Sequence, residues 1–190
     1  MKALGYTLAN PASAYDWDMR KITVALITIG AIFLNPSAAT AADQYQALAS
    51  QVSYGIYKPS NTLGFKPLNF EVRPCRLFPK RDKYLLAGFG GMDHGIALVE
   101  TSAQYNCTGV DTPQSLGTTT INGIRAYVGI YCASKNCTKS DFMTHGGEIT
   151  FVTPKTKTRA STYIRVGTQG GFSLNQLIAF ANGLKLVTVP

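Results

Sequence analysis

Residues 121–132 read INGIRAYVGIYC, and they carry a clear β-strand pattern. Apolar and other positions alternate from Ile124 to Cys132, which is the period of a strand with one buried face. One face holds Ile124, Ala126, Val128 and Ile130, and the other holds Arg125, Tyr127, Gly129 and Tyr131. The stretch therefore predicts a strand whose first face lies in the core and whose second face is aromatic and basic.

Further strand-like runs lie on both sides of this stretch, and turn-forming clusters separate them. They cover residues 69–73, 84–89, 95–101, 147–153 and 161–168. In the last run, Tyr163 and Arg165 alternate with Ile164 and Val166. This run repeats the pattern of one apolar face and one aromatic, basic face.

Two segments have helical patterns. In GGFSLNQLIAFANGL, Ser173 is a candidate N-cap and Gly183 a stop signal. Between them, apolar residues recur at helical spacing at Leu174, Leu177, Ile178 and Ala181. Residues 43–52 are a weaker candidate for a short N-terminal helix. Together with the strands, these segments predict an α+β domain: a mostly antiparallel, twisted sheet with the C-terminal helix packed on one face.

The sequence from Met19 onward has the form of a secretory signal peptide. A basic start precedes an apolar core over residues 22–34, and the small residues that follow fit cleavage after Ala41 or Ala42. A membrane anchor is the alternative, but this core is shorter than the ~20 residues that span a bilayer. We expect translation to start at Met19, with residues 1–42 as extension and signal. Residues 43–190 then form a single secreted or periplasmic domain without a transmembrane span.

The chain is basic. Removing Lys2, Arg20 and Lys21 from the 18 basic residues, and Asp16 and Asp18 from the 10 acidic ones, leaves a mature net charge near +7. Such a surplus favours anionic partners, although it also serves solubility in many exported proteins. We expect an anionic envelope polymer or lipid, or an envelope protein, as partner, and no nucleic acid.

All four cysteines follow the signal segment, and an even number in an exported chain indicates disulfides. Cys132 and Cys137 bracket a four-residue turn, which suits a short bridge and leaves Cys75 to pair with Cys107. The alternative is a zinc site with four thiolates. The chain has no pair of cysteines separated by two residues, and the expected compartment is oxidising, so we expect two disulfides, no metal and no cofactor.

Three segments together resemble a bacterial domain of unknown function found in exported proteins and anti-sigma-factor-associated lipoproteins. They are Ile121-Asn122-Gly123, residues 147–152 and residues 173–184. The resemblance implies a regulatory protein that binds another envelope protein. More distantly, the expected architecture is similar to the curved sheet of lipoprotein carriers, whose concave face holds acyl chains.

The chain has two histidines, each close to an acid in the sequence. His94 follows Asp93, and His145 precedes Glu148 by three residues. Such pairs serve as general bases or metal ligands, which leaves a small hydrolase as one hypothesis. Both histidines also lie in glycine-rich segments that are typical of turns, and we favour that interpretation.

Basic and aromatic residues offer a candidate ligand-binding surface. If PKTKTR is extended, Lys155, Lys157 and Arg159 point the same way and can bind phosphate or carboxylate groups. The alternative is a solvated hairpin loop between 153 and 161. The full candidate set is Arg125, Tyr127, Tyr131, Lys155, Lys157, Arg159, Tyr163 and Arg165. The tyrosines and arginines of this set can equally cover a sheet against solvent, because both have apolar bodies and polar ends.

The leading hypothesis is a secreted or periplasmic, non-enzymatic binding module for an anionic or amphiphilic cell-envelope ligand. It depends on the export signal, the positive charge of the mature chain and the lack of a recognisable catalytic constellation in the sequence. The regulatory protein and the hydrolase that uses His94 or His145 are the alternatives.

Overall fold

The computed structural model describes residues 41–75, 83–91, 94–104, 107, 113–133 and 136–188. The start expected at Met19, the extension before it and the apolar core of the signal lie outside these residues. The expected cleavage positions, Ala41 and Ala42, lie in the first turn of helix α1 (Ala41–Ala49). Within the described part of the chain, no helix has the length and hydropathy that a bilayer span requires.

Seven strands form one sheet in which every neighbouring pair is antiparallel. Their order across the sheet is β2-β3-β4-β8-β7-β6-β5. The strands are β2 (Pro67–Pro74), β3 (Lys83–Gly90), β4 (Gly95–Ser102), β5 (Gln114–Ile121), β6 (Ile124–Ile130), β7 (Gly147–Val152) and β8 (Thr162–Thr168). The mostly antiparallel sheet expected from the sequence is therefore confirmed.

Strand β6 has the predicted alternation, since Ala126, Val128 and Ile130 are buried while Tyr127 is exposed. The strand begins at Ile124 rather than Ile121, because Asn122 and Gly123 both have positive φ angles, 48° and 80°. Two such residues form the tight turn that suits a two-residue hairpin. Strand β5 on the other side of this turn was not predicted, because its sequence QSLGTTTI has few large apolar residues.

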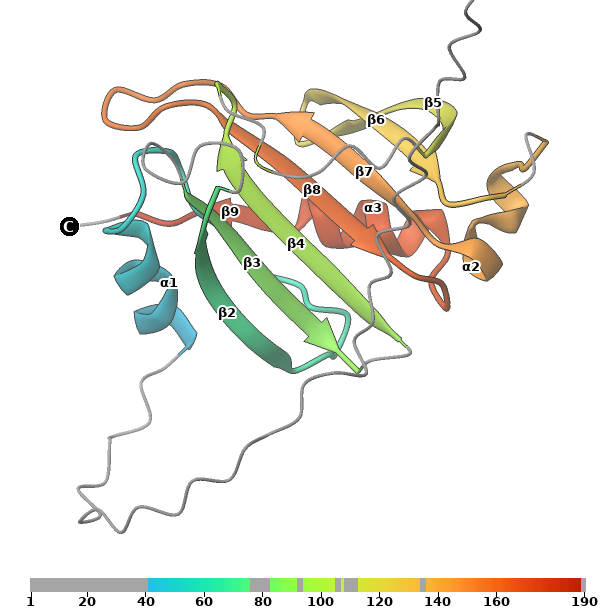
Figure 1. Ribbon diagram of the computed structural model, residues 1–190, viewed down its shortest axis with the longest axis horizontal. Coiled ribbons are helices and arrows are strands. Elements are labelled where there is room, and N and C mark those ends of the chain that lie inside the picture. Colours follow the sequence, from blue (N-terminus) through green and yellow to red (C-terminus); the bar gives the residue numbers. More distant parts are fainter. Residues whose placement is uncertain are drawn as a thin grey trace, which may run out of the picture. The chain divides into compact units, whose positions relative to one another are not determined.

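The C-terminal helix α3 (Leu174–Asn182) forms where the sequence predicts it. Ser173 Oγ accepts a hydrogen bond from the amide of Gln176, and the Gln176 side chain accepts one from the amide of Ser173. This reciprocal cap satisfies two donors at the helix start. The apolar side of α3 packs on the sheet in the main core, and Figure 1 shows α3 behind β7 and β8.

A second core cluster joins α1 and the segment after it to β2 and β3. Figure 1 shows α1 beside β2. Helix α1 ends at Ala49, earlier than the expected end at residue 52. The chain then forms strand β1 (Tyr57–Pro59), which pairs with β9 (Leu184–Leu186) in a separate two-stranded sheet. Neither β1 nor β9 is among the strands predicted from the sequence. Their pairing depends on residues more than a hundred positions apart, which local patterns do not reveal.

Both predicted disulfides are present, Cys75–Cys107 and Cys132–Cys137. Because all four cysteines are in disulfides, none offers a thiolate for the zinc site that was the alternative. The second disulfide precedes a short helical segment, which consists of a 3₁₀ turn (η2, Lys139–Asp141) and α2 (Phe142–His145). Gly146 ends α2 and leads directly into β7.

Candidate functional site

The candidate site lies on the outer face, which we define as the side of the sheet opposite α3. On β6 this face holds Arg125 and Tyr127, at positions that alternate with the buried Ala126 and Val128. Tyr127 is paired with Thr150 on β7, and Thr150 is paired with Arg165 on β8. Because paired residues of antiparallel strands share a face, these three side chains lie in one row across the sheet. The tertiary structure thus joins the two aromatic, basic strand faces that the sequence predicted separately.

Glu148 joins two of the predicted residues on the outer face. Its Oε2 atom lies 2.9 Å from Arg165 Nε and accepts a hydrogen bond of 2.6 Å from the Tyr131 hydroxyl. Both charged side chains are largely buried, with exposed fractions of 15% for Arg165 and 8% for Glu148. A buried charge needs a partner of this kind, because removing it from water is costly. Arg165 therefore has its charge compensated by Glu148.

Tyr163 lies on the same face, one alternate position from Arg165, and is half-buried. Burial raises the pKa of its phenol, and the nearby Glu148 carboxylate adds to this effect. A hydrogen bond with Thr150 and the charge of Arg165 act in the opposite direction. The phenol is therefore neutral at physiological pH and is suited to hydrogen bonding rather than to acting as an anion.

Beyond Glu148, Arg165 and Tyr163, the outer face carries exposed apolar side chains beside the guanidinium group of Arg125. Tyr127 is 60% exposed and Val152 is 46% exposed. The guanidinium carbon of Arg125 lies 5.8 Å from the centre of the Tyr127 ring, which is within the range of a cation–π contact. Arg125 is itself exposed. This part of the face combines apolar side chains with a positive charge that solvent can reach.

The connection from β7 to β8 is a hairpin loop, not the extended row that was one of the two alternatives. The amide of Thr156 donates to the carbonyl of Arg159, and the amide of Arg159 donates to the Thr156 hydroxyl. The Arg159 guanidinium donates to the carbonyl of Val52 at 2.6 Å. Arg159 thus ties the loop to the segment after α1, whereas Lys155 and Lys157 are exposed.

Of the two pairs that the sequence suggested, only that of His145 with Glu148 lies within the described residues, and there Glu148 has other partners. Glu148 contacts Arg165 and Tyr131, as described above. Asp93, the neighbour of His94, lies outside the described residues. His94 is exposed just before β4, and His145 is the exposed last residue of α2. A nitrogen of the His145 imidazole lies within 4.8 Å of the sulfur atoms of Cys132 and Cys137.

Sequence reasoning missed Glu148, Thr150 and Val152 as members of the site. A signal for Glu148 was present, because it alternates with the buried Ile149 in GEITFV. Its partners, however, depend on the register between β7 and β8. That register places the carboxylate beside Arg165.

Comparisons with protein-family models, curated proteins and solved structures found no match for the chain. The resemblance to an exported, anti-sigma-associated domain therefore stays a prediction. The arrangement of side chains on the outer face is the basis for the function proposed below.

Proposed function

We propose that the protein is an exported, non-enzymatic binding module whose outer face contacts an anionic lipid surface. The observation that carries this proposal is the exposed Tyr127 with Arg125 over its ring, on a sheet face that the main helix leaves uncovered. Aromatic side chains with an apolar body and a polar tip suit the boundary between headgroups and acyl chains.

The surrounding charges support a lipid with an anionic headgroup. Val152 is exposed at the end of β7, and the exposed Lys155 and Lys157 follow in the next loop. Each lysine near an anionic membrane surface contributes about 1 kcal/mol of attraction. Arg165 does not add to this attraction, because Glu148 compensates its charge. The exposed apolar residues favour a lipid over a purely polar polymer, which offers no partner for Tyr127 and Val152.

The disulfides are consistent with an exported protein, since such bonds persist in oxidising compartments. The signal pattern from Met19 and the positive charge of the remaining chain support the same location. An envelope location would place the protein where anionic lipids are available.

The test is co-sedimentation with vesicles of phosphatidylcholine alone or of equal parts phosphatidylcholine and phosphatidylglycerol. We expect binding to the anionic vesicles only, and less binding at high salt because exposed charges are screened. Lys155→Ala with Lys157→Ala should weaken this binding by about 10- to 30-fold, since two contributions of about 1 kcal/mol are lost. Tyr127→Ala should weaken it as well.

The matched control is Lys66→Ala with Lys185→Ala, which removes two exposed lysines from outside the outer face. An equal loss in this control would contradict a role for the outer face, and equal binding to both vesicle types would contradict recognition of anionic lipid. Binding to purified anionic envelope polymer but not to vesicles would favour the polymer. Recovery of one stoichiometric envelope protein, without vesicle binding, would favour the regulatory alternative.

A further inference from the structure

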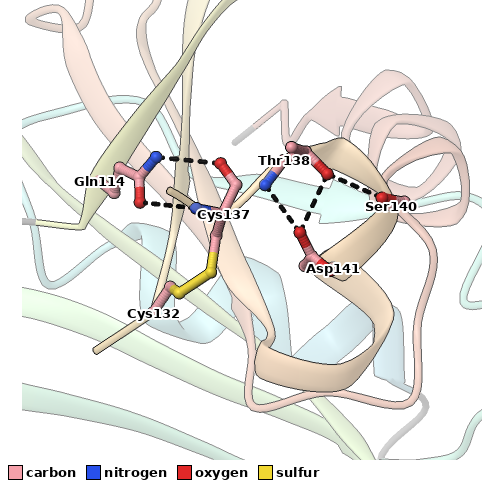
Figure 2. Close-up of a disulfide and its surroundings, with 6 residues drawn as sticks. All are labelled: Gln114, Cys132, Cys137, Thr138, Ser140 and Asp141. Carbon is pink, nitrogen blue, oxygen red and sulfur yellow. Dashed lines mark hydrogen bonds between the residues drawn. A yellow bond between two sulfur atoms is a disulfide. The ribbon is translucent and has the colours of Figure 1, made fainter. Parts of the chain in front are cut away.

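A cluster of metal-ligating atoms lies beside the end of β6, away from the residues of the proposed lipid surface. The sulfur atoms of Cys132 and Cys137 and a ring nitrogen of His145 all lie within 4.8 Å of one another. The two sulfurs are joined in a disulfide, which Figure 2 shows with its surroundings. In this oxidised form the sulfurs are not thiolates, and thiolates are the form in which cysteine binds metals.

This disulfide is the more accessible of the two. Cys132 and Cys137 are half-buried, whereas Cys75 and Cys107 are buried, with exposed fractions of 0% and 8%. Thiol–disulfide exchange requires access of the attacking group to a sulfur atom. A reductant in solvent therefore reaches the Cys132–Cys137 bond before the Cys75–Cys107 bond.

Contacts that do not involve sulfur hold Cys137 and the start of the segment that leads to His145. The Gln114 side chain donates to the carbonyl of Cys137 at 2.9 Å and accepts from its amide at 3.3 Å, as Figure 2 shows. The next residue, Thr138, donates from its amide to Asp141 at 2.8 Å and so starts the helical segment that ends at His145. None of these hydrogen bonds includes a sulfur atom, so breaking the sulfur–sulfur bond does not itself remove them.

We propose that reduction of the Cys132–Cys137 disulfide converts this cluster into a Zn²⁺ site with two thiolates and the His145 imidazole as ligands. A dithiol reductant supplies two electrons and two protons, is itself oxidised to a disulfide, and leaves two protein thiols. Zn²⁺ then displaces the two thiol protons and forms two Zn–S bonds and one Zn–N bond. This inference is independent of the proposed lipid surface.

The geometry suits zinc. Tetrahedral Zn²⁺ with Zn–S bonds of about 2.3 Å separates its ligand atoms by about 3.7 Å. The imidazole nitrogen already lies within 4.8 Å of both sulfurs, and the two sulfurs, which are now bonded to each other, move apart to this separation after reduction. Three protein ligands leave the fourth position open to water or to an external ligand, as in zinc sites that bind substrates.

The experiment uses purified full-length protein and Co²⁺ as a spectroscopic substitute for Zn²⁺. A phosphine reductant avoids a competing thiol, because with water it yields the phosphine oxide and two protein thiols. We expect one equivalent of Co²⁺ to bind after reduction, with tetrahedral visible bands and a thiolate charge-transfer band, and Zn²⁺ to displace it. Thiol alkylation and mass measurement should show that only Cys132 and Cys137 are reduced under these conditions.

Two histidine variants test whether His145 itself binds the metal ion or whether loss of any histidine weakens metal binding. His145→Ala should weaken Co²⁺ binding by more than the roughly 10-fold cost of losing even an outer partner of a metal site. His94→Ala is the matched control, since His94 is the other histidine of the chain and is also exposed, and it should bind as wild type does. Absence of Co²⁺ bands in reduced wild-type protein would overturn the proposal. Equal binding by wild type and both variants would also overturn it.

Discussion

The carboxyl group of Glu100 lies in the core near α1 and has an exposed fraction of 0%. One oxygen accepts a hydrogen bond of 2.9 Å from the amide of Tyr57, while the other oxygen has no hydrogen-bond partner among the residues that the structure describes. Burial raises the pKa of this carboxyl well above its ordinary value, and the Tyr57 amide offsets only part of the rise. Tyr45 of α1 faces the same group, and burial and Glu100 both raise the pKa of its phenol. Both side chains are therefore neutral near pH 7.

Glu100→Gln tests, through the pH dependence of stability, whether the Glu100 carboxyl is neutral in the folded protein. In the unfolded chain the carboxyl ionises near its ordinary pKa of 4.5, while the folded protein still holds the proton. The contribution of Glu100 to stability is therefore largest below that pH and falls above it, by up to about 1.4 kcal/mol per pH unit, until the folded pKa is passed. Glutamine cannot ionise, so the variant should exceed wild type in stability near pH 7 and match it near pH 4.

Urea unfolding of both proteins between about pH 4 and pH 8 measures this difference. Other titrating groups contribute equally to the two proteins, so the difference between them isolates Glu100. A constant difference across the whole range would show that Glu100 is ionised in the folded state.

At the scale of elements, the junction between α2 and β7 leaves no room for a side chain at Gly147. A Cβ atom there would overlap the carbonyl oxygen of Gly129 and would lie 2.6 Å from Phe142 Cε2. Phe142 is fully buried, and Gly129 belongs to the neighbouring strand β6. The close approach of α2, β6 and β7 therefore depends on glycine at this position.

Gly147→Ala should destabilise the protein by about 3 kcal/mol or more, because both the backbone of β6 and a core aromatic residue must move. Gly91→Ala is the matched control, since a Cβ atom at Gly91 meets no atom of the described residues within 4 Å. The control should change stability by no more than about 0.5 kcal/mol. Urea unfolding of the two variants checks the prediction, and similar losses in both would argue against the tight junction.

At the scale of the whole molecule, β4 ends and β5 begins at opposite ends of the strands of the sheet. Ser102 at the end of β4 is paired with Thr162, the first residue of β8. Gln114 at the start of β5 is paired with Ile130, the last residue of β6. Cys107 lies within this connection and is bonded to Cys75, which directly follows β2. The disulfide therefore links the connection that leads to β5, at one edge of the sheet, to the residue that follows β2, the strand at the other edge.

Removing the two disulfides one at a time should have unequal effects. The cysteines of the Cys75–Cys107 bridge are 32 residues apart, and loop entropy predicts a loss of about 4 kcal/mol without it. The Cys132–Cys137 pair is 5 residues apart, which predicts a loss of about 2 kcal/mol. Paired cysteine-to-alanine variants, compared by urea unfolding, test this order. A larger loss from the shorter bridge would show that chain entropy does not govern the difference.

Local patterns predicted the parts of this protein that depend on neighbours in the chain. The alternation in β6, the cap at Ser173 and the short Cys132–Cys137 bridge each involve residues a few positions apart. With one short bridge assigned, the count of four cysteines determined the other. Strand β5 escaped prediction because a threonine-rich edge strand buries little apolar surface and has a weak pattern.

The tertiary structure alone decided which polar side chains meet. Antiparallel register placed Glu148 beside Arg165, and the packing of α1 brought the carbonyl of Val52 to Arg159. The first contact compensates the charge of Arg165, and the second holds the guanidinium group of Arg159 against the backbone. Of the cations predicted to bind a ligand, Arg125, Lys155 and Lys157 are exposed. The physical reason is that periodicity tells which face a residue occupies, whereas a charge finds its partner only through strand order and register.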